Sequence, residues 1–274
     1  MDIQGVFNIP FAEMRKYIAG KRRVLPTKTW RDIQQSAHAK AFVIAGVSKM
    51  DFLIDVLGIL KEQSENGVNY SDFRKQFREK VAAHGWTKFQ DETRSYQAWR
   101  TQIIFNTNVR TAYAAGRWEQ MNSETSAENF PYLVYRHSFY GKPKNPREEH
   151  LAFDGIVLPK NHNFWKEFYP NGKFGCNCGV EQLTTKEAER EMKKSGKGET
   201  IEAVETHIKT LGAEMKKHRD SGWAYNVGMD DSVGIKSLIE RTQKIIASDK
   251  YSPHQKEVAE MTLKEISEKY PEFV

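Results

Sequence analysis

Two histidines and both cysteines of the chain lie in one central stretch and form a candidate metal site. They are His150, His162, Cys176 and Cys178. Imidazole nitrogens and thiolates are ligands that suit zinc, and a bound metal would hold together a segment that has little apolar material to bury. The cysteine spacing argues against this interpretation: structural zinc sites usually separate paired cysteines by about two to four residues, whereas only Asn177 stands between these two.

A second interpretation of the same stretch is acid–base chemistry on a phosphodiester. Arginines could bind the anion and a histidine could move protons, and the candidates are Arg136, His137, Arg147, His150 and Asp154. The sequence has no Gly-rich phosphate loop, nucleophile elbow or HExxH helix to fix their geometry. This alternative would make the chain a nucleic-acid-cleaving or toxin-like enzyme that uses Arg147, His150 and Asp154.

A third interpretation assigns these side chains to structure, and the residue pattern favours it. Arg147, Asp154 and the two histidines would hydrogen-bond the turns of an irregular loop, and the thiols would pack as small apolar groups. Trp165 and Tyr169 would form a small core beneath the loop. We therefore expect no catalytic residue and no required cofactor. Zinc at the two histidines and two cysteines remains an alternative, as a metal-stabilised interaction module.

Regular elements must position this stretch. Residues 140–179 contain five glycines and four prolines without a helical period, and a segment of that length is too long for an idle loop in a compact domain. Residues 131–137 alternate and carry β-forming side chains, which predicts a strand. Residues 179–183 predict a second strand, and Thr184 or Thr185 is expected to cap the helix that follows.

The first 120 residues are predicted to be helical. Apolar side chains at spacings of three and four predict helices over 27–46 and 49–65, the second ending at Asn66-Gly67. Ser71 is expected to cap a further helix that ends at His84-Gly85, and a long helix is predicted over about 90–121. The side chains expected in the core along one side of this long helix are Trp99, Ile103 and Tyr113.

The last 90 residues are predicted to be helical and are rich in charge. One helix is expected over about 199–218, followed by a Gly/Asp-rich break over 220–234 and two further helices. Ser252-Pro253 is expected to open the last of them. Its predicted apolar side consists of Val258, Met261, Leu263 and Ile266.

These elements predict a mainly helical α+β protein with three regions. They are a helical N-terminal arm over residues 1–120, a small irregular α+β central domain with short strands over 121–185, and a helical C-terminal tail over 186–274. The chain has 274 residues, of which 39% are hydrophobic and 12% aromatic, so a fully disordered chain is excluded.

Composition also limits the compartment and the partners. Two cysteines cannot form a disulfide framework. No stretch approaches the roughly 18 apolar residues that a membrane span needs, and the N-terminus lacks the features of a signal peptide. We therefore expect a protein kept inside a cell, with no membrane partner.

The excess positive charge lies in the N-terminal region. Residues 1–120 carry 19 Lys and Arg against 12 Asp and Glu, whereas the whole chain has a net charge of +6. Such an imbalance can mark a nucleic-acid surface. Because acidic residues interleave the scattered lysines, ordinary solvated helix faces are the favoured interpretation.

The central motifs resemble the phage Mu protein F family of minor head, or head morphogenesis, proteins of tailed phages and prophages. They occur in the order Arg147-x-x-His150, Asp154-Gly155-x-Val-Leu-Pro159, His162-x-Phe-Trp165 and Tyr-Pro-Asn-Gly172-x-x-Gly175-Cys-x-Cys178. Further similar segments are Leu25-Pro-Thr27, Trp30-Arg-Asp-Ile33, His38-Ala-x-Ala-Phe42, Gly85-Trp86, Trp99-Arg100, Asn106-Thr-Asn-x-Arg-Thr-x-Tyr-Ala-Ala-Gly116 and Gly222-Trp-x-Tyr-Asn-Val-Gly228. Asn177 departs from the pattern, which would have a basic residue there. That departure weakens any claim that the loop contacts phosphate.

The resemblance implies a non-enzymatic protein of the phage head. Proteins of this kind are low-copy components associated with the portal vertex and needed for a packaging-competent procapsid. The implied partners are the portal protein and inner capsid or scaffold proteins, with phage DNA as a further partner of the basic N-terminal half. The implied location is the head interior or vertex of the virion, and the host bacterial cytoplasm during assembly. The family also lends its central domain to bacterial toxins.

Overall fold

The computed structural model describes residues 11–21, 23–33, 37–67, 69–142, 145–170, 174–229 and 232–273. Its contacts divide the chain into two compact units. We call residues 12–14 and 109–229 the central unit, and residues 11, 15–108 and 232–273 the flanking unit. Helix α7 (Arg94–Met121) contributes its residues up to Asn108 to the flanking unit and the others to the central unit.

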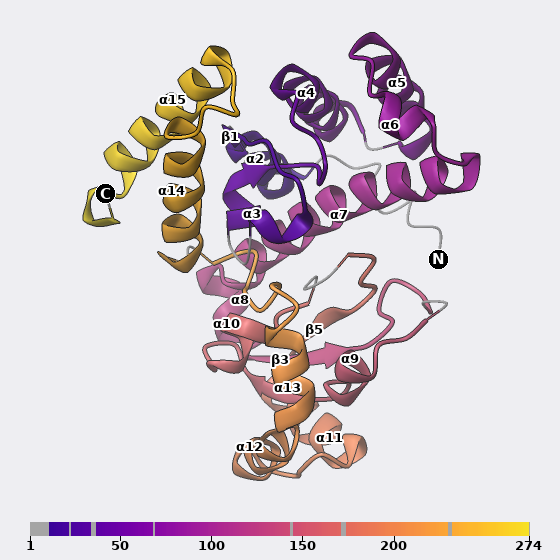
Figure 1. Cartoon of the computed structure of the whole chain (residues 1–274). Helices are drawn as coiled ribbons and strands as arrows, with labels where there is room; N and C mark the ends of the chain where they lie inside the picture. Colours follow the sequence, from indigo (N-terminus) through magenta and orange to yellow (C-terminus); the bar gives the residue numbers. More distant parts are fainter. Residues whose placement is uncertain are drawn as a thin grey trace. The chain divides into compact units, whose positions relative to one another are not determined.

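A three-stranded antiparallel sheet lies within the central unit (Figure 1). Strand β3 (Tyr132–Arg136) pairs with β4 (Val157–Pro159) on one side and with β5 (Gly179–Leu183) on the other. The strands predicted over 131–137 and 179–183 are confirmed. Strand β4 escaped prediction because three residues are too few to show an alternating pattern.

The helices of the central unit that follow α7 are short. Thr184 caps one of them, α11, through a capping box with Glu187, as predicted. The single helix predicted over 199–218 is wrong, because the chain forms two helices with Leu211 between them. At this break the Leu211 N–H donates to the Ile208 carbonyl, three residues back along the chain. The helices are α8 (Glu124–Asn129), α9 (Glu148–Ala152), α10 (Phe164–Phe168), α11 (Thr185–Ser195), α12 (Ile201–Thr210) and α13 (Gly212–Arg219).

Aromatic side chains fill the core of the central unit. The Trp165 indole N–H donates to the Pro159 carbonyl at 2.9 Å, and the Tyr169 hydroxyl donates to the Ala114 carbonyl of α7 at 3.0 Å. Both rings are buried, which confirms the predicted core beneath the loop. The other large buried aromatic side chains here are Tyr135, Phe153, Phe164, Phe168, Trp223 and Tyr225.

The flanking unit is helical apart from a pair of two-residue parallel strands, β1 (Arg23–Val24) and β2 (Ala41–Phe42). The helix predicted over 49–65 is confirmed as α4 and ends before Gly67. The predicted cap Ser71 is wrong by two residues, because the Asn69 side chain accepts the Ser71 N–H at 2.8 Å. The helical elements are α2 (Ala12–Gly20), whose residues 12–14 belong to the central unit, η1 (Trp30–Asp32), α3 (Ala37–Lys40), α4 (Met50–Asn66), α5 (Tyr70–Ala83), α6 (Thr87–Gln90), α14 (Ser232–Ile246), α15 (Pro253–Lys269) and η2 (Pro271–Phe273).

The helix predicted over 27–46 is wrong. Among the described residues of that stretch, which leave out 34–36, only η1 and α3 are helical, and β2 follows α3 directly. The apolar spacing that suggested a helix still buries Ile33, Ala37 and Ala41, in one cluster with residues of α14 and α15. Tertiary packing therefore uses these side chains without a continuous helix, because a short helical period does not distinguish a helix from a turn that buries the same residues.

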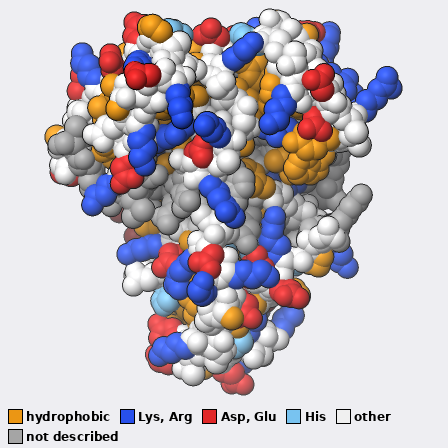
Figure 2. Space-filling model, viewed as in Figure 1, with side chains coloured by type: hydrophobic (Ala, Val, Ile, Leu, Met, Phe, Trp, Pro, Cys, Tyr) orange, Lys and Arg blue, Asp and Glu red, His pale blue; other side chains and the backbone are white. Residues whose placement is uncertain are grey.

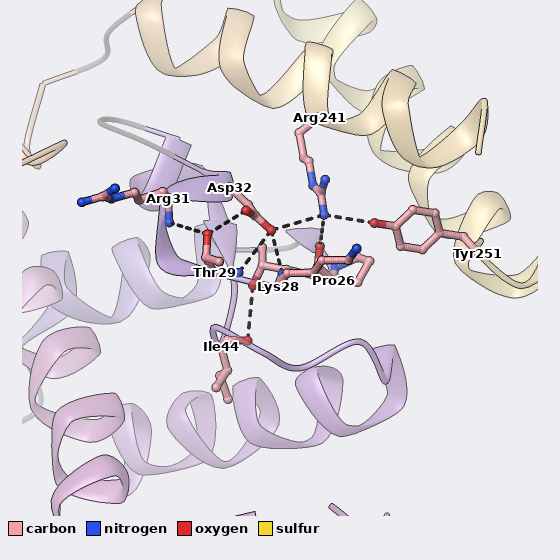
Figure 3. A network of polar contacts seen from close by, with 9 residues as sticks. Pro26, Lys28, Thr29, Arg31, Asp32, Ile44, Arg241 and Tyr251 are labelled. Carbon is pink, nitrogen blue, oxygen red and sulfur yellow. Dashed lines mark hydrogen bonds and ion pairs between the residues drawn. The ribbon is translucent and has the colours of Figure 1, made fainter. Parts of the chain in front are cut away.

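A polar network holds residues 26–32 in their turn (Figure 3). The Asp32 carboxylate accepts the Lys28 N–H at 2.6 Å and the Thr29 hydroxyl at 2.8 Å. Arg241 of α14 donates to the Pro26 carbonyl at 2.7 Å and lies 3.7 Å from Asp32. These bonds satisfy backbone groups that a helix would have satisfied internally.

Two predicted core residues are exposed. The Trp99 side chain of α7 is 55% exposed and Met261 of α15 is 59% exposed. The buried face of α15 instead follows Ala259, Thr262 and Ile266, which recur at spacings of three and four. The buried face of α15 is thus rotated about the helix axis relative to the predicted apolar side. Ser252 and Pro253 open α15 as predicted.

The predicted fold class, mainly helical α+β, is confirmed. Within the described residues, no helix is long and apolar enough to span a membrane. The division at residues 120 and 185 stays a prediction about domains, because compactness alone does not test which parts fold independently.

The first testable consequence concerns the Asp32 network and pH. Burial alone would raise the pKa of Asp32, but hydrogen bonds from Lys28 and Thr29 and the charge of Arg241 outweigh it and lower the pKa below its ordinary 3.8. The network therefore stabilises the fold above that pH, and this stabilisation is lost as the pH falls through the lower folded-state pKa. We expect Asp32→Asn to reduce the free energy of unfolding near neutral pH, with a difference from the wild type that shrinks below pH 3.8.

Chemical denaturation across this pH range measures the effect. Asp249→Asn is the matched control. The Asp249 side chain is fully exposed and its Oδ1 lies 3.8 Å from Lys256 Nζ, and such an exposed ion pair contributes little to stability. A difference for Asp32→Asn that stayed constant with pH would contradict the prediction.

Candidate functional site

Helix α9 presents His150 to the interior of the central unit. His150 is only 2% exposed, and the residue before it, Glu149, is 3% exposed. At the start of the helix, the Arg147 guanidinium donates to the Phe174 carbonyl at 2.7 Å. Because Phe174 lies two residues before Cys176, this bond holds α9 against the chain that carries the cysteines.

The two cysteines lie in the segment 174–178, here called the cysteine bend, which turns at Phe174 and Gly175 and leads directly into β5. The Cys178 N–H lies 3.4 Å from the Cys176 sulfur and points to it, so that both thiols turn toward the same interior space. Arg110 of α7 donates to the Cys176 carbonyl at 2.9 Å and to the Asn177 side chain. Asn177 also donates to the Gly141 carbonyl at 3.0 Å. The residue that departs from the family pattern thus ties the bend to two other segments.

Three of the four predicted metal ligands lie together. The Nδ1 atom of His150 is 3.5 Å from the Cys176 sulfur and 3.6 Å from the Cys178 sulfur. All three side chains are buried, and their ligand atoms lie within 4.8 Å of one another.

The fourth predicted ligand, His162, lies elsewhere. Its Nδ1 accepts the Phe164 N–H at 3.1 Å, and its Nε2 contacts the Glu205 carboxylate at 3.0 Å. Since Nδ1 is an acceptor here, Nε2 carries the proton and donates to Glu205. Both ring nitrogens of His162 are thus used by the loop and by α12. Asn171 and Gly172 of the motif lie outside the described residues.

The pKa values of the two thiols are shifted in opposite directions. The hydrogen bond from Cys178, helped by His150, lowers the pKa of Cys176 well below its usual value, although burial opposes the shift. The same hydrogen bond, together with burial, raises the pKa of Cys178. Because the two thiols share this hydrogen bond, they titrate as a coupled pair that releases its first proton more readily than its second.

The residues proposed for phosphodiester chemistry each have a structural partner. Arg136 forms ion pairs with Glu181 at 2.7 Å and Glu191 at 2.6 Å. Asp154 accepts the His137 N–H at 2.7 Å, and Arg147 bonds the Phe174 carbonyl. This geometry gives the catalytic interpretation no support. It confirms that Arg147, Asp154 and His162 hydrogen-bond the backbone of the loop.

Sequence reasoning did not single out Arg110 or Tyr135 as site residues. Arg110 belongs to the segment Asn106-Thr-Asn-x-Arg-Thr, whose run of polar residues in the middle of a long helix is the signal that could have identified it. Tyr135 lies in the predicted strand 131–137, its hydroxyl interacts with the Cys178 thiol, and burial raises its pKa. An alternating strand pattern does not reveal which of its residues meets a distant cysteine.

The role of Arg110 can be tested directly. Arg110→Gln removes the charged donor that holds the cysteine bend, and a hydrogen bond from a charged group contributes about 1.5–3 kcal/mol. We expect the free energy of unfolding to fall by roughly that amount, and Cys176 and Cys178 to react faster with a thiol reagent. The matched control is Arg94→Gln, in an exposed position of the same helix. An unchanged thiol reaction rate in Arg110→Gln would show that the bend holds its shape without this side chain.

Comparisons with known proteins agree with the central motifs. Residues 57–181 match the family described as Phage Mu protein F like protein. The putative capsid assembly protein F of Escherichia phage Mu is 26% identical over 269 residues, which cover 88% of this chain and 60% of that protein. The Mu-like prophage FluMu F protein of Haemophilus influenzae is 28% identical over 226 residues, covering 74% of this chain and 53% of that protein.

The chain thus spans between about half and three fifths of the length of these curated relatives. No solved structure matches the chain. The candidate cluster of His150, Cys176 and Cys178 lies within the matched range. The predicted resemblance is confirmed: residues 57–181 of this chain are similar to the phage Mu protein F-like family.

Proposed function

We propose that this protein acts in assembly of the head of a tailed phage or prophage, as a non-enzymatic minor head protein. The observation that carries the proposal is the match over 88% of the chain to a phage Mu protein named as a putative capsid assembly protein. The partners we infer are the portal protein and inner capsid or scaffold proteins. The location we infer is the head interior or vertex of the virion, and the host bacterial cytoplasm during assembly.

The fold supports a binding role in two respects. The residues around the cysteine bend are tied to one another by hydrogen bonds and burial, which suits a rigid docking module. Large apolar side chains are exposed in both units, and exposed aromatic groups are frequent anchors in protein interfaces. These side chains are Ile54 (46%), Trp99 (55%), Phe130 (38%), Phe139 (42%), Leu151 (53%) and Met261 (59%).

Quantitative mass spectrometry of phage-like particles induced from the source strain tests the assembly role. We expect a few copies of the protein per particle, and we expect its amount to follow that of the portal protein through purification. Procapsids and filled heads are analysed separately, with an abundant host protein as the contamination control. Complete absence from both kinds of particle would overturn the proposal.

DNA contact is a separate part of the proposal and has its own support. The 19 basic against 12 acidic residues of positions 1–120 favour an acidic partner. On the face shown in Figure 2, however, Lys and Arg side chains lie among Asp and Glu side chains. Contact with phosphates would therefore use separate basic side chains and be weak and independent of base sequence.

Fluorescence anisotropy with a labelled DNA duplex measures this contact at two salt concentrations. We expect binding at low salt that weakens at least about tenfold between 50 and 200 mM salt, since each neutralised phosphate releases counterions. Binding that is absent at low salt, or that does not change with salt, would remove DNA from the list of partners and leave the assembly role untouched.

A further inference from the structure

We propose that His150, Cys176 and Cys178 bind one zinc ion in the central unit, through Nδ1 of the imidazole and the two cysteine sulfurs. The three residues come from α9 and from the bend before β5, and all three are buried. This inference stands on the geometry of the cluster alone and does not depend on the role in head assembly.

The distances within the cluster fit a tetrahedral zinc ion. With Zn–S bonds of about 2.3 Å and Zn–N bonds of about 2.0–2.1 Å, tetrahedral angles place a sulfur and a nitrogen ligand about 3.6 Å apart. The distances from His150 Nδ1 to the two sulfurs are 3.5 Å and 3.6 Å. The ligand atoms all lie within 4.8 Å of one another, which leaves room for sulfurs separated by the about 3.8 Å that the same geometry requires.

Hydrogen bonding alone explains this arrangement less well. Nδ1 of an imidazole has a single lone pair in the plane of the ring, so it accepts one S–H donor with good geometry. Two sulfurs lie at nearly equal distances from that one atom, although it can hydrogen-bond well to only one of them. The buried Nε2 atom of His150 has no hydrogen-bond partner among the described residues. A metal satisfies both sulfurs and Nδ1 at once.

The bend before β5 removes the objection raised by the short cysteine spacing. Paired zinc ligands are usually about two to four residues apart because the chain must turn to direct both sulfurs at one point. Here the chain turns at Phe174 and Gly175, before both cysteines, and the Cys178 N–H points to the Cys176 sulfur at 3.4 Å with only Asn177 between them. Arg110 and Gly141 hold Asn177 in place. The one-residue spacing therefore still brings both thiols to the same side.

The surroundings suit a zinc–thiolate group. Two thiolates and a neutral imidazole compensate the charge of Zn²⁺, so that the buried cluster carries no net charge, whereas an uncompensated buried thiolate is costly. The Arg110 guanidinium places a positive charge beside the thiolates, where it donates to the Cys176 carbonyl at 2.9 Å. The Tyr135 hydroxyl interacts with Cys178 and orients that ligand.

Three protein ligands leave one position of a tetrahedral zinc ion for a further ligand such as water. No other histidine, cysteine, aspartate or glutamate among the described residues joins the cluster. The ion would link α9 to the start of β5, and thereby close the Gly/Pro-rich segment that begins after β3. We assign it a structural role, because a metal that bridges two parts of such a segment contributes directly to its folding.

Metal analysis of the full chain, expressed in zinc-supplemented medium and purified without chelator, is the first test. We expect about one zinc per chain, and replacement by Co²⁺ should produce visible absorption bands of a tetrahedral site together with a sulfur-to-cobalt charge-transfer band. Less than about half an equivalent of zinc, together with no charge-transfer band, would overturn the proposal. A disulfide between Cys176 and Cys178 in freshly purified protein would overturn it as well.

Variants identify the ligands. Cys176→Ser, Cys178→Ser and His150→Ala should each lose most of the zinc, whereas the matched control His162→Ala should keep it, because His162 is engaged with Glu205 and Phe164. Loss of zinc in His162→Ala, or its retention in both cysteine variants, would refute this ligand set.

Tyr135→Phe should weaken zinc binding by about tenfold or more in competition with a chelator. If the ligand variants fail to fold, the cobalt spectrum of the wild-type chain still decides.

Discussion

The pairing of β3 with β5 is the constraint on which the candidate site depends. Arg136 at the end of β3 pairs with Gly179 at the start of β5, so the chain between them, which contributes β4 to the sheet, must return to the point where β3 ends. Cys178 is the residue just before β5 begins, and Tyr135 is the residue just before β3 ends. Backbone hydrogen bonds of the sheet thereby fix the cysteine bend against β3, and the segment between has only to deliver α9 to the same place.

Polar interactions between distant residues hold the irregular segments of both units. In the central unit, Arg147 and Arg110 bond backbone carbonyls of the segment that carries the cysteines. In the flanking unit, Arg241 does the same for Pro26. An irregular segment cannot pair its own backbone groups as a helix does, so buried carbonyls require donors from elsewhere. Arginine suits this task because it offers several donors and remains charged.

The similarity to phage proteins concerns what the whole protein does, whereas the candidate metal cluster concerns how one segment of it stays folded. The relatives support a role in building a phage head, for which binding surfaces matter more than reactive groups. The cluster concerns how one segment within the matched range is kept folded. Asn177 connects the two, because at a position where the resemblance led us to expect a basic residue it donates to the Gly141 carbonyl and accepts from Arg110. In this chain the bend is thus built for internal contacts.

Local patterns determined much of the fold before any tertiary structure was known. They identified β3 and β5, both ends of α4, the starts of α11 and α15, and the burial of Trp165 and Tyr169, because caps, glycine stops and alternation act over a few residues. Tertiary structure alone decided that residues 26–32 form a turn around Asp32, since the decisive donor, Arg241, is more than two hundred residues away in the chain. It also decided that His150 and not His162 faces the cysteines. Residue type marks both histidines as ligands, but which of them reaches the thiols depends on the path of the chain between β3 and β5, and that path is set by long-range pairing and packing.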